Sequence, residues 1–431
     1  MVDRRTLLLG SAGLLFVGCS GGKDSEGAKP SPKGPNIVKP RTGNVVDEAD
    51  LKELAGRLNQ ALRSGDVKQL MGVIDADGFA LEDFEKRWTR RMANFDRLGT
   101  IEGEWYIGLP GGRTRNAAGG LVEYNGDLVF AHTVKGCDGQ QVVESMRAGF
   151  RKKSTDAPLE LTNVGDVDAY FDPSIWDVAE IDAIETKHAQ IVFRLKDAKR
   201  AKAFAGRIEA GAKRAFEVMP NPSGVSKVFY ALTWPAIDGK LWGGVAVGDA
   251  DAHAYYHPFL DPMELARGQR KVAGNKNLPL ATGRVGLHEG TFNRPDFEDV
   301  ACHEAVHVLA EQWRGGTGRA PTWAVEGLAT WGERPGSGLL AAEGGRIRAA
   351  FPGFQSVALK GYDEFHQTSR EYDYYMCAGA VYEYLDSEKG RDAVFETAAA
   401  FYGAKDRKAA AKQLGRSEKD LLAATRKWLG A

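Results

Sequence analysis

Two histidines and a glutamate in "ACHEAVHVLAEQW", residues 301–313, have a spacing that suits metal chemistry. His303 and His307 are four residues apart, so on a helix both imidazoles lie on one face and can ligate one ion. Glu304 is rotated by about 100° from His303 on such a helix. Its carboxylate can therefore reach a water on that ion without ligating it. The segment predicts a metal site with a general base beside it.

A catalytic metal of this kind normally takes three protein ligands and leaves one position for water. The segment "PTWAVEGLATWGE", residues 321–333, offers Glu326, which follows His307 by 19 positions. On a helix Glu326, Thr330 and Glu333 line one face. The stretch between the two segments is rich in turn residues, so it can return the second helix against the first. Glu326 is therefore the candidate third ligand.

The helix that carries the two histidines must itself be held in place. Its apolar residues recur at i, i+4, i+7 and i+11 and predict a stripe that buries one side, made of Cys302, Val306, Leu309 and Trp313. Asp296 and Asp299 lie near the start of the segment, where either can cap the helix or stabilise its positive end.

"HEAVH" followed by "WAVEGLA" resembles the gluzincin metallopeptidases, whose third ligand is the glutamate of an E-G-x-A helix. The spacing is similar to that of the aminopeptidase-N-like group, and the surrounding residues resemble the peptidase-MA-like domains of bacterial exported proteins. The resemblance covers the chain from near residue 210 to its end. It implies that His303, His307 and Glu326 bind Zn²⁺ and that Glu304 is the general base of peptide-bond hydrolysis.

A third segment, "YDYYMCAGAVYEYL", residues 372–385, predicts a helix with a face of small residues. The resemblance implies that a tyrosine upstream of an apolar leucine on this helix stabilises the oxyanion, and Tyr375 stands ten residues before Leu385. An O–H donor directed at developing negative charge is a sound use of a tyrosine. Two alternatives remain open: Tyr374 or Tyr372 has that role, or all three are core and rim aromatics.

The segment "GRVGLHEGTF", residues 283–292, predicts a strand just before the metal helix. The resemblance implies that an edge strand at this place pairs with the extended substrate backbone. We expect His288 and Glu289 at the rim of the site. His253 and His257 in "AHAYYHP" are also four apart, but the proline and the aromatic residues beside them favour a loop or a strand, so no metal is assigned to them.

The remaining histidines and cysteines carry weaker patterns. His132, His188 and His366 stand alone, and each is expected to be exposed or hydrogen-bonded. Three cysteines lie beyond the first 20 residues, so at most one disulfide forms among them, and Cys302–Cys377 is the preferred pair. Cys302 also belongs to the apolar stripe, where a buried inert thiol is expected.

Composition and charge describe an ordinary globular chain. Its 431 residues suffice for two or three domains. Lys and Arg number 57 against 58 Asp and Glu, which gives a net charge of −1. No domain has the basic excess of a nucleic-acid-binding protein, so no nucleic-acid partner is expected. The sequence leaves the oligomeric state open.

Residues 1–19 predict an export signal. A pair of arginines precedes an apolar run from Leu7 to Val17 and small residues around Cys19. "FVGC" resembles a lipoprotein box, in which Cys19 is lipidated and becomes the mature N-terminus, and the arginine pair more weakly resembles a twin-arginine signal. The alternative is an ordinary cleaved signal in which Cys19 has no role. We expect an extracytoplasmic lipoprotein of the cell envelope, held at the membrane by its N-terminal lipid.

The fold class expected from the sequence is α+β. Residues 20–45, rich in Gly, Ser, Pro and Lys, predict a flexible linker. Residues 46–205 begin with helical periodicity, first in Glu48–Ser64, and continue as short β-rich runs, which predicts helices on an antiparallel sheet. This order resembles the nuclear-transport-factor-2-like cone. Residues 206–431 predict a mainly helical, zincin-like metallopeptidase domain with a small sheet.

These features together predict an exported, lipid-anchored zinc metallopeptidase that acts on a peptide or protein substrate. Endopeptidase action is favoured, because the G-x-M-E-N segment that grips the substrate amine in aminopeptidase-N-like enzymes does not occur in the sequence. The alternative is a non-catalytic ligand-binding or scaffold lipoprotein with a vestigial or structural zinc site. A third hypothesis is that the N-terminal domain inhibits or gates the peptidase.

Overall fold

The computed structural model describes most of the chain beyond residue 45. The described residues are 46–74, 81–108, 114–116, 122–154, 156–167, 174–221, 224–234, 252–268, 280–314, 320–336, 338–360, 365–366 and 369–431. The expected signal with Cys19 and the expected linker, residues 20–45, lie outside them. Within the described part, no helix combines the length and the apolar character needed to cross a membrane.

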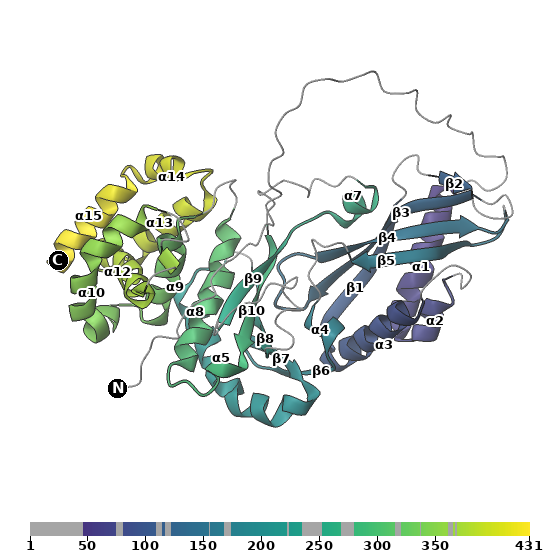
Figure 1. Cartoon of the computed structure of the whole chain (residues 1–431), viewed down its shortest axis with the longest axis horizontal. Helices are drawn as coiled ribbons and strands as arrows, with labels where there is room; N and C mark the ends of the chain where they lie inside the picture. Colours follow the sequence, from purple (N-terminus) through teal and green to yellow (C-terminus); the bar gives the residue numbers. More distant parts are fainter. Residues whose placement is uncertain are drawn as a thin grey trace, which may run out of the picture.

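The N-terminal unit is an antiparallel sheet with helices on one face (Figure 1). The strands run in the order β1-β3-β4-β5 with β2 beside β3; they are β1 (Ile101–Gly108), β2 (Thr114–Asn116), β3 (Val122–Val134), β4 (Val142–Lys152) and β5 (Leu159–Val167). The helices are α1 (Glu48–Ser64), α2 (Val67–Met71) and α3 (Leu81–Leu98). Trp88 of α3 packs on Trp105 and Phe130 of the sheet, with ring centroids 4.6 and 5.2 Å apart.

A second sheet forms the centre of the molecule. Its order is β6-β7-β8-β10-β9, with parallel pairs β7–β8 and β8–β10 and antiparallel outer strands. The strands are β6 (Ile181–Glu185), β7 (Ala189–Arg194), β8 (Val228–Thr233), β9 (Ala252–Pro258) and β10 (Leu280–His288). The prediction that the strand before the metal helix is the edge strand is therefore wrong. Strand β10 lies inside the sheet, and β9 occupies the edge among the described strands.

Two helices cover one face of this sheet, α5 (Ala198–Val218) over β6 and β7 and α8 (Phe297–Ala310) over β9 and β10. The helices meet closely at Gly211 of α5, where a Cβ atom would lie 2.6 Å from the carbonyl oxygen of Glu298. From the sheet, the Tyr230 hydroxyl donates to the carbonyl oxygen of Ala301 at 2.9 Å. The position of α8 is thus set by a helix and a strand that precede it by many residues.

The C-terminal half is a helical layer packed beside α8. Its helices are α9 (Thr322–Glu333), α10 (Gly338–Ala358), α12 (Glu371–Lys389), α13 (Arg391–Gly403), α14 (Arg407–Leu414) and α15 (Glu418–Leu429). The predicted small-residue face of α12 is confirmed: a Cβ atom on Gly327 of α9 would lie 2.5 Å from the carbonyl oxygen of Ala378. The two helices therefore cross at backbone contact distance.

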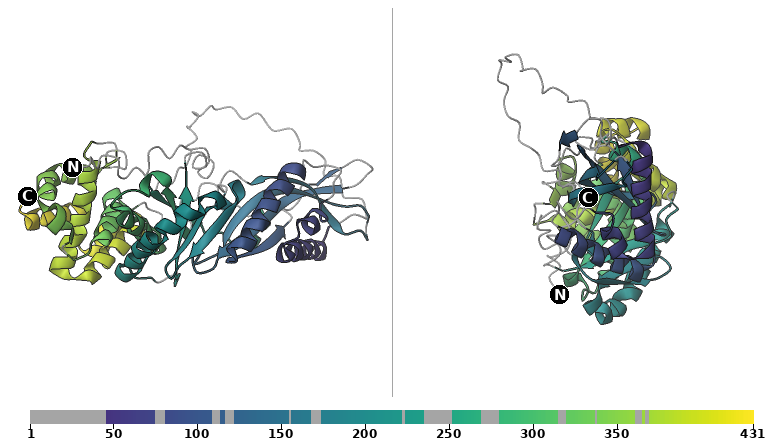
Figure 2. Two further views of the ribbon diagram at one scale, coloured as in Figure 1. Left: turned by 90° about the horizontal axis from the view of Figure 1, so that it is seen from below. Right: turned by 90° about the vertical axis from the view of Figure 1, so that its right-hand side faces the viewer.

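The expected α+β class is confirmed, with a curled antiparallel sheet in the N-terminal region and a mainly helical C-terminal part with a small sheet. Figure 2 shows the second sheet between the N-terminal unit and the C-terminal helices. The expected boundary at residue 205 falls inside α5. Strands β6 and β7, which precede residue 205, are in the same sheet as β8 and β10. Residues on both sides of that position thus form one layered unit.

The predicted disulfide is wrong. Cys302 and Cys377 are both buried and free, as is Cys137. The Cys302 thiol lies 3.6 Å from the carbonyl oxygen of Gly332, and the Cys377 thiol lies 3.7 Å from that of Ile347. Each thiol thus fills a separate site between helices, and the buried inert thiol expected at position 302 is confirmed.

Candidate metal centre

Helix α8 is buried on every side after its first turn. The predicted apolar stripe describes only part of this burial, because the second sheet, α5 and α9 all contact the helix. Trp313 is not part of α8: it is half-buried in a short 3-10 turn after the helix end. Asp296 occupies the N-cap position but makes no capping bond, since its carboxylate pairs with Arg294 at 3.0 Å.

The structure brings together the three residues named as ligands. The Nε2 atoms of His303 and His307 each lie 3.4 Å from Oε2 of Glu326. All three ligand atoms lie within 4.8 Å of one another, and the three residues are 1% exposed. Bonds of about 2.0–2.1 Å at tetrahedral angles place two ligand atoms about 3.4 Å apart. The two distances from the histidines to Glu326 therefore fit ligands of a tetrahedral metal ion.

The same three atoms make no hydrogen bond of normal geometry within the described part of the chain. Burial of such polar groups without partners costs free energy. Burial opposes a charge on His303, but the carboxylates of Glu326 and Glu333 outweigh it and raise the pKa of His303 to about 10. The group thus favours positive charge at the point where the three atoms meet, which a metal ion could supply. His303, His307 and Glu326 form a buried group that can bind a metal ion.

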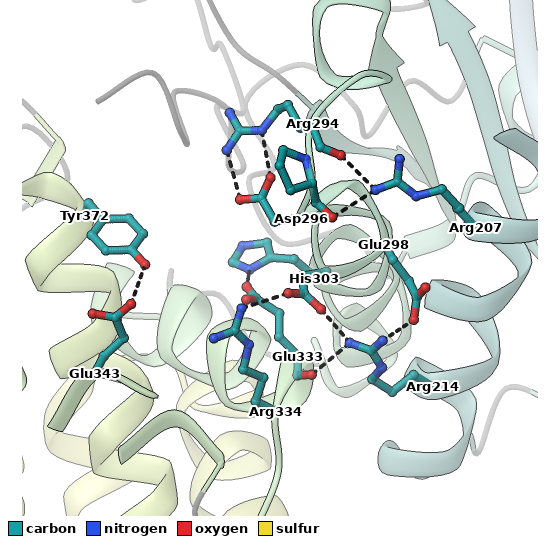
Figure 3. Close-up of polar contacts among 12 residues, drawn as sticks. Arg207, Arg214, Arg294, Asp296, Glu298, His303, Glu333, Arg334, Glu343 and Tyr372 are labelled. Carbon is teal, nitrogen blue, oxygen red and sulfur yellow. Dashed lines mark hydrogen bonds and ion pairs between the residues drawn. The ribbon is translucent and has the colours of Figure 1, made fainter. Parts of the chain in front are cut away.

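A second carboxylate fixes the orientation of His303 (Figure 3). Nδ1 of His303 lies 2.6 Å from Oε1 of Glu333, so Nδ1–H can donate to that carboxylate and Nε2 is the ring atom that faces Glu326. Arg214 of α5 donates to the carbonyl oxygen of Glu333 at 3.0 Å and to Asp299 at 2.7 Å. Arg334 binds the other oxygen of Asp299 at 2.9 Å. This network joins α5, α8 and the end of α9 behind the ligand.

Glu304 lies beside the ligand group and is 1% exposed. Its carboxylate accepts a hydrogen bond from the backbone N–H of Ala254 on the edge strand β9. Its Oε2 atom makes no hydrogen bond among the described residues. Burial raises the pKa of the Glu304 carboxyl to about 7, although His307 and His303 act in the opposite direction. A carboxylate tuned near neutral pH suits a group that takes up and returns a proton.

Tyr375 lies beside the ligand group, next to His303. It is fully buried, and its ring centroid is 6.1 Å from that of His303. Its hydroxyl lies 3.4 Å from Nδ1 of His366, and the same nitrogen lies 2.7 Å from Oε1 of Glu371. The Tyr375 hydroxyl is thus connected to the Glu371 carboxylate through His366.

The two neighbouring tyrosines lie elsewhere. Tyr374 packs between Phe354 and Phe365, with ring centroids 6.0 and 6.2 Å away. The Tyr372 hydroxyl lies 3.5 Å from a carboxylate oxygen of Glu343, away from His303 (Figure 3). Of the three candidates, the structure places Tyr375 beside the histidine ligand.

The other histidines lie outside the ligand group. His253 and His257 are on β9, as the strand alternative predicts, and each forms an aromatic contact with Tyr255. His288 ends β10, where its side chain accepts from the N–H of Gly290. His132 and His188 are far from the ligands in sequence and lie beside Glu144 and Glu209 respectively. The expectation that the isolated histidines are exposed or hydrogen-bonded is met at positions 188 and 366.

Sequence reasoning missed two features of the centre. His366 was treated as isolated, yet it joins Glu371 and Tyr375; its separation from Glu371 by five residues carries no recognisable motif. Ala254 was not singled out, because a backbone N–H has no sequence pattern. Glu333 was placed on the face of Glu326, but its bond to His303 is known only from the structure.

Comparisons with known proteins leave the centre to be interpreted from its own geometry. No protein-family model matches the chain, and a search of curated proteins finds no match.

Proposed function

We propose that this protein is an exported zinc-dependent metallopeptidase that hydrolyses peptide bonds, more as an endopeptidase than as an exopeptidase. One observation carries the proposal: three buried ligand atoms, from His303, His307 and Glu326, converge without other hydrogen-bond partners among the described residues, and Glu304 lies beside them. The resemblance of "HEAVH" and "WAVEGLA" to the gluzincins supports the same activity.

Zinc is the ion proposed because two imidazoles and one carboxylate are the ligand set of catalytic zinc in several hydrolases. Softer ions would prefer thiolates, and Mg²⁺ or Ca²⁺ would prefer oxygen ligands alone. A bound Zn²⁺ ion acts as a Lewis acid that polarises a carbonyl group and lowers the pKa of water. His303, His307 and Glu326 would hold it.

Different side chains around the ligands then transfer the proton and stabilise the developing negative charge. Glu304 takes a proton from the attacking water and returns it to the leaving amine. Its raised pKa, about 7, makes both transfers accessible near neutral pH. The Tyr375 O–H group donates to the carbonyl oxygen as negative charge develops there. His366 and Glu371 hold the Tyr375 hydroxyl in place for that donation.

The edge strand β9 is the proposed place for the substrate backbone. An extended peptide can add to a sheet edge by main-chain hydrogen bonds, whatever its side chains. Such binding needs no terminal amine or carboxylate, and the sequence lacks the amine-gripping segment of aminopeptidase-N-like enzymes. Both points favour endopeptidase action on an unfolded or extended substrate.

The proposed location is the cell envelope. The layout of residues 1–19 and the lipoprotein-like "FVGC" support export followed by attachment through a lipid on Cys19. The linker, residues 20–45, would then separate the catalytic part from the membrane surface.

The test is Glu304→Gln in the chain from residue 46 onward, loaded with Zn²⁺. We expect one zinc ion per chain as in the wild type, because Glu304 is not a ligand, and a loss of about 10²–10⁴-fold in cleavage of an unfolded casein substrate, the usual contribution of a general base. The matched control is Glu396→Gln, on the exposed face of α13, which should cleave like the wild type. Zinc is measured by atomic emission and cleavage by fluorescence.

Full activity in Glu304→Gln would show that Glu304 is not the general base. The wild type could also bind zinc and retain its fold, yet show no chelator-sensitive turnover on casein or on a mixed peptide library. That result would favour the binding or scaffold alternative.

A further inference from the structure

The edge strand β9 has two different faces. Ala252 and Ala254 are buried against the core that includes α8, whereas His253, Tyr255 and His257 point the other way and contact one another. Strand β9 packs against α8, which carries Glu304, and the backbone N–H of Ala254 stabilises the Glu304 carboxylate. The position of β9 therefore decides where Glu304 is held, and the other face of β9 must be supported by some other part of the molecule.

The turn between β3 and β4 of the N-terminal unit binds the backbone of the second sheet. The Gly136 carbonyl oxygen accepts from the N–H groups of Ser226 and Lys227 at 2.8 and 2.9 Å, just before β8. The Gln140 N–H group donates to the carbonyl oxygen of Ala281 on β10 at 3.2 Å. Backbone bonds of this kind fix one sheet against the other without depending on side-chain identity.

A buried ion pair strengthens this junction next to β9. Nη2 of Arg284 on β10 lies 2.9 Å from Oδ2 of Asp138 in the same turn, and both side chains are at most 1% exposed. Arg284 is the direct strand partner of Tyr255 on β9. Its guanidinium also lies over Trp176 and Phe229, 5.2 and 5.1 Å from the ring centroids. The N-terminal unit thus holds β10 at Arg284, the residue that pairs with Tyr255 in the middle of β9.

Helix α7 (Pro262–Ala266) holds the other end. It follows β9 after three residues and lies on the face of the first sheet that α1 and α3 leave free (Figure 1). Its anchor residues Leu265 and Ala266 are buried with apolar residues of β3 and β4, namely Val129, Ala131 and Val143.

The contact between α7 and β1 is a backbone contact that only glycine permits. A Cβ atom on Gly108 would lie 2.3 Å from the carbonyl oxygen of Ala266 and 2.4 Å from its carbonyl carbon. Gly108 is not among the glycines with positive φ, so its constraint is steric rather than conformational. A methyl group at this position would therefore clash with the C-terminal end of α7.

We propose that the N-terminal unit is a positioning element of the candidate active site. Through the β3–β4 turn and through α7 it holds β9 at the distance from α8 that places Ala254 against Glu304 and aligns the edge for an extended peptide. The kinetic consequence rests on the proposed function, whereas the restraint on β9 is a property of the fold. The unit is thus a fixed support of the β9 edge, where the substrate backbone is proposed to bind, rather than a detachable gate.

The experiment compares Gly108→Ala with Gly56→Ala in the zinc-loaded chain from residue 46 onward. Gly56 lies in α1 of the same unit, and a Cβ atom there meets nothing within 4 Å. We expect Gly108→Ala to raise amide hydrogen exchange over residues 252–258 about tenfold, with unchanged exchange over α8 and α9. It should lower kcat/KM for unfolded casein by about tenfold or more, because small misplacements of reacting groups are costly. Zinc content should stay at one per chain. Gly56→Ala should match the wild type in all three measurements.

A folded Gly108→Ala protein with wild-type exchange over residues 252–258 overturns the inference, as does faster exchange confined to α7. If Gly108→Ala does not fold, Leu265→Ala, which removes an anchor of α7 without adding atoms, takes its place with the same expected results. A wild type without any hydrolysis contradicts the proposed function instead, and the exchange measurement still decides the inference about β9.

Discussion

Three glutamates within the candidate centre have the same side chain and different environments. Burial would raise the pKa of the Glu326 carboxyl, but His307 and His303 lower it far below its ordinary value, so it stays ionised as a ligand. Burial raises the pKa of Glu304 to about 7, which suits a base. Burial also raises the pKa of Glu333 against the opposing hydrogen bond from His303. Groups whose environments separate their pKa values can take separate roles.

The role of Tyr375 can be tested at the same scale. Tyr375→Phe removes one O–H donor without changing the packing, so kcat for casein should fall about 10²–10³-fold, the usual cost of losing an oxyanion donor. KM should change little, because the donation strengthens only as charge develops. The matched control is Tyr374→Phe, whose ring packs between Phe354 and Phe365 and should remain near wild type. Equal losses in the two variants would speak against the assignment.

At the scale of elements, close crossings decide where the ligands meet. Helix α8 approaches α5 at Gly211, and α9 approaches α12 at Gly327, each within a distance that a Cβ atom would not allow. Gly327 follows Glu326 directly, so the crossing of α9 and α12 places the third ligand. The E-G pair therefore has two physical functions: the glutamate supplies a ligand and the glycine supplies the packing that positions it.

Gly327→Ala tests this coupling. The added methyl group would lie 2.5 Å from the carbonyl oxygen of Ala378 and must push the helices apart. We expect a loss of about 1–3 kcal/mol in the free energy of unfolding, typical of overpacking, together with weaker zinc binding in a competition titration. Gly345→Ala in α10 is the control, because a Cβ atom there meets nothing within 4 Å and the substitution should be neutral or stabilising. Unchanged zinc affinity in Gly327→Ala would show that the crossing of α9 and α12 does not determine how Glu326 is placed as a ligand.

Glu383 of α12 links two helices and should make stability depend on pH. It accepts the N–H of Leu340 in the first turn of α10 at 3.1 Å, and burial raises its pKa from 4.5 to about 7. The folded chain therefore keeps a proton that the unfolded chain releases, so this group's stabilisation is lost as pH rises from about 4.5 through 7. Glu383→Gln keeps an acceptor and removes this titration.

We expect Glu383→Gln and the wild type to have similar free energies of unfolding at pH 5, and the variant to be more stable by on the order of 1 kcal/mol at pH 8. Urea unfolding at both pH values measures the difference, and Glu396→Gln on the exposed face of α13 serves as the control. A difference that is independent of pH would contradict the raised pKa.

At the scale of the whole molecule, the N-terminal unit and the second sheet share a core and a polar junction. Phe229 and Ala231 of β8 are buried with Trp176 and Val134 in one apolar cluster. Arg91 of α3 binds Asp177 and Glu144 at 2.7 Å each, and all three side chains are at most 7% exposed. Asn94 of α3 donates to the carbonyl oxygens of Trp176 and Ala179, 2.8 Å each. Such a junction resists separation, because each buried partner would lose its counterpart.

The chain should therefore unfold as one unit. A chain from residue 46 onward should give a single transition with agreeing calorimetric and van't Hoff enthalpies. A chain that begins at residue 205 lacks β6, β7 and the start of α5, so we expect it to show no cooperative transition by circular dichroism. A chain that begins at residue 174 keeps the whole second sheet and is the comparison. Two separated transitions in the longer chain would show that the junction is weak.

Much of the local structure was predictable from the sequence alone. Helical periodicity located α1 and α8, and the H-E-x-x-H spacing placed His303 and His307 on one helix, because neighbours on a helix surface are set by residue separation. Glu326 was found by its distance along the chain and by the residues around it. The structure brings it to 3.4 Å from both histidines. These features depend on contacts between residues that are close in sequence.

Tertiary structure alone decided the rest. It put β9 rather than β10 at the sheet edge, buried α8 on all sides, left Cys302 and Cys377 unpaired, and joined His366 to Tyr375. It also set Asp138 against Arg284, 146 residues away. Strand order and helix crossings are fixed by which surfaces bury each other, and periodicity within a segment shows that a face is apolar without naming its partner.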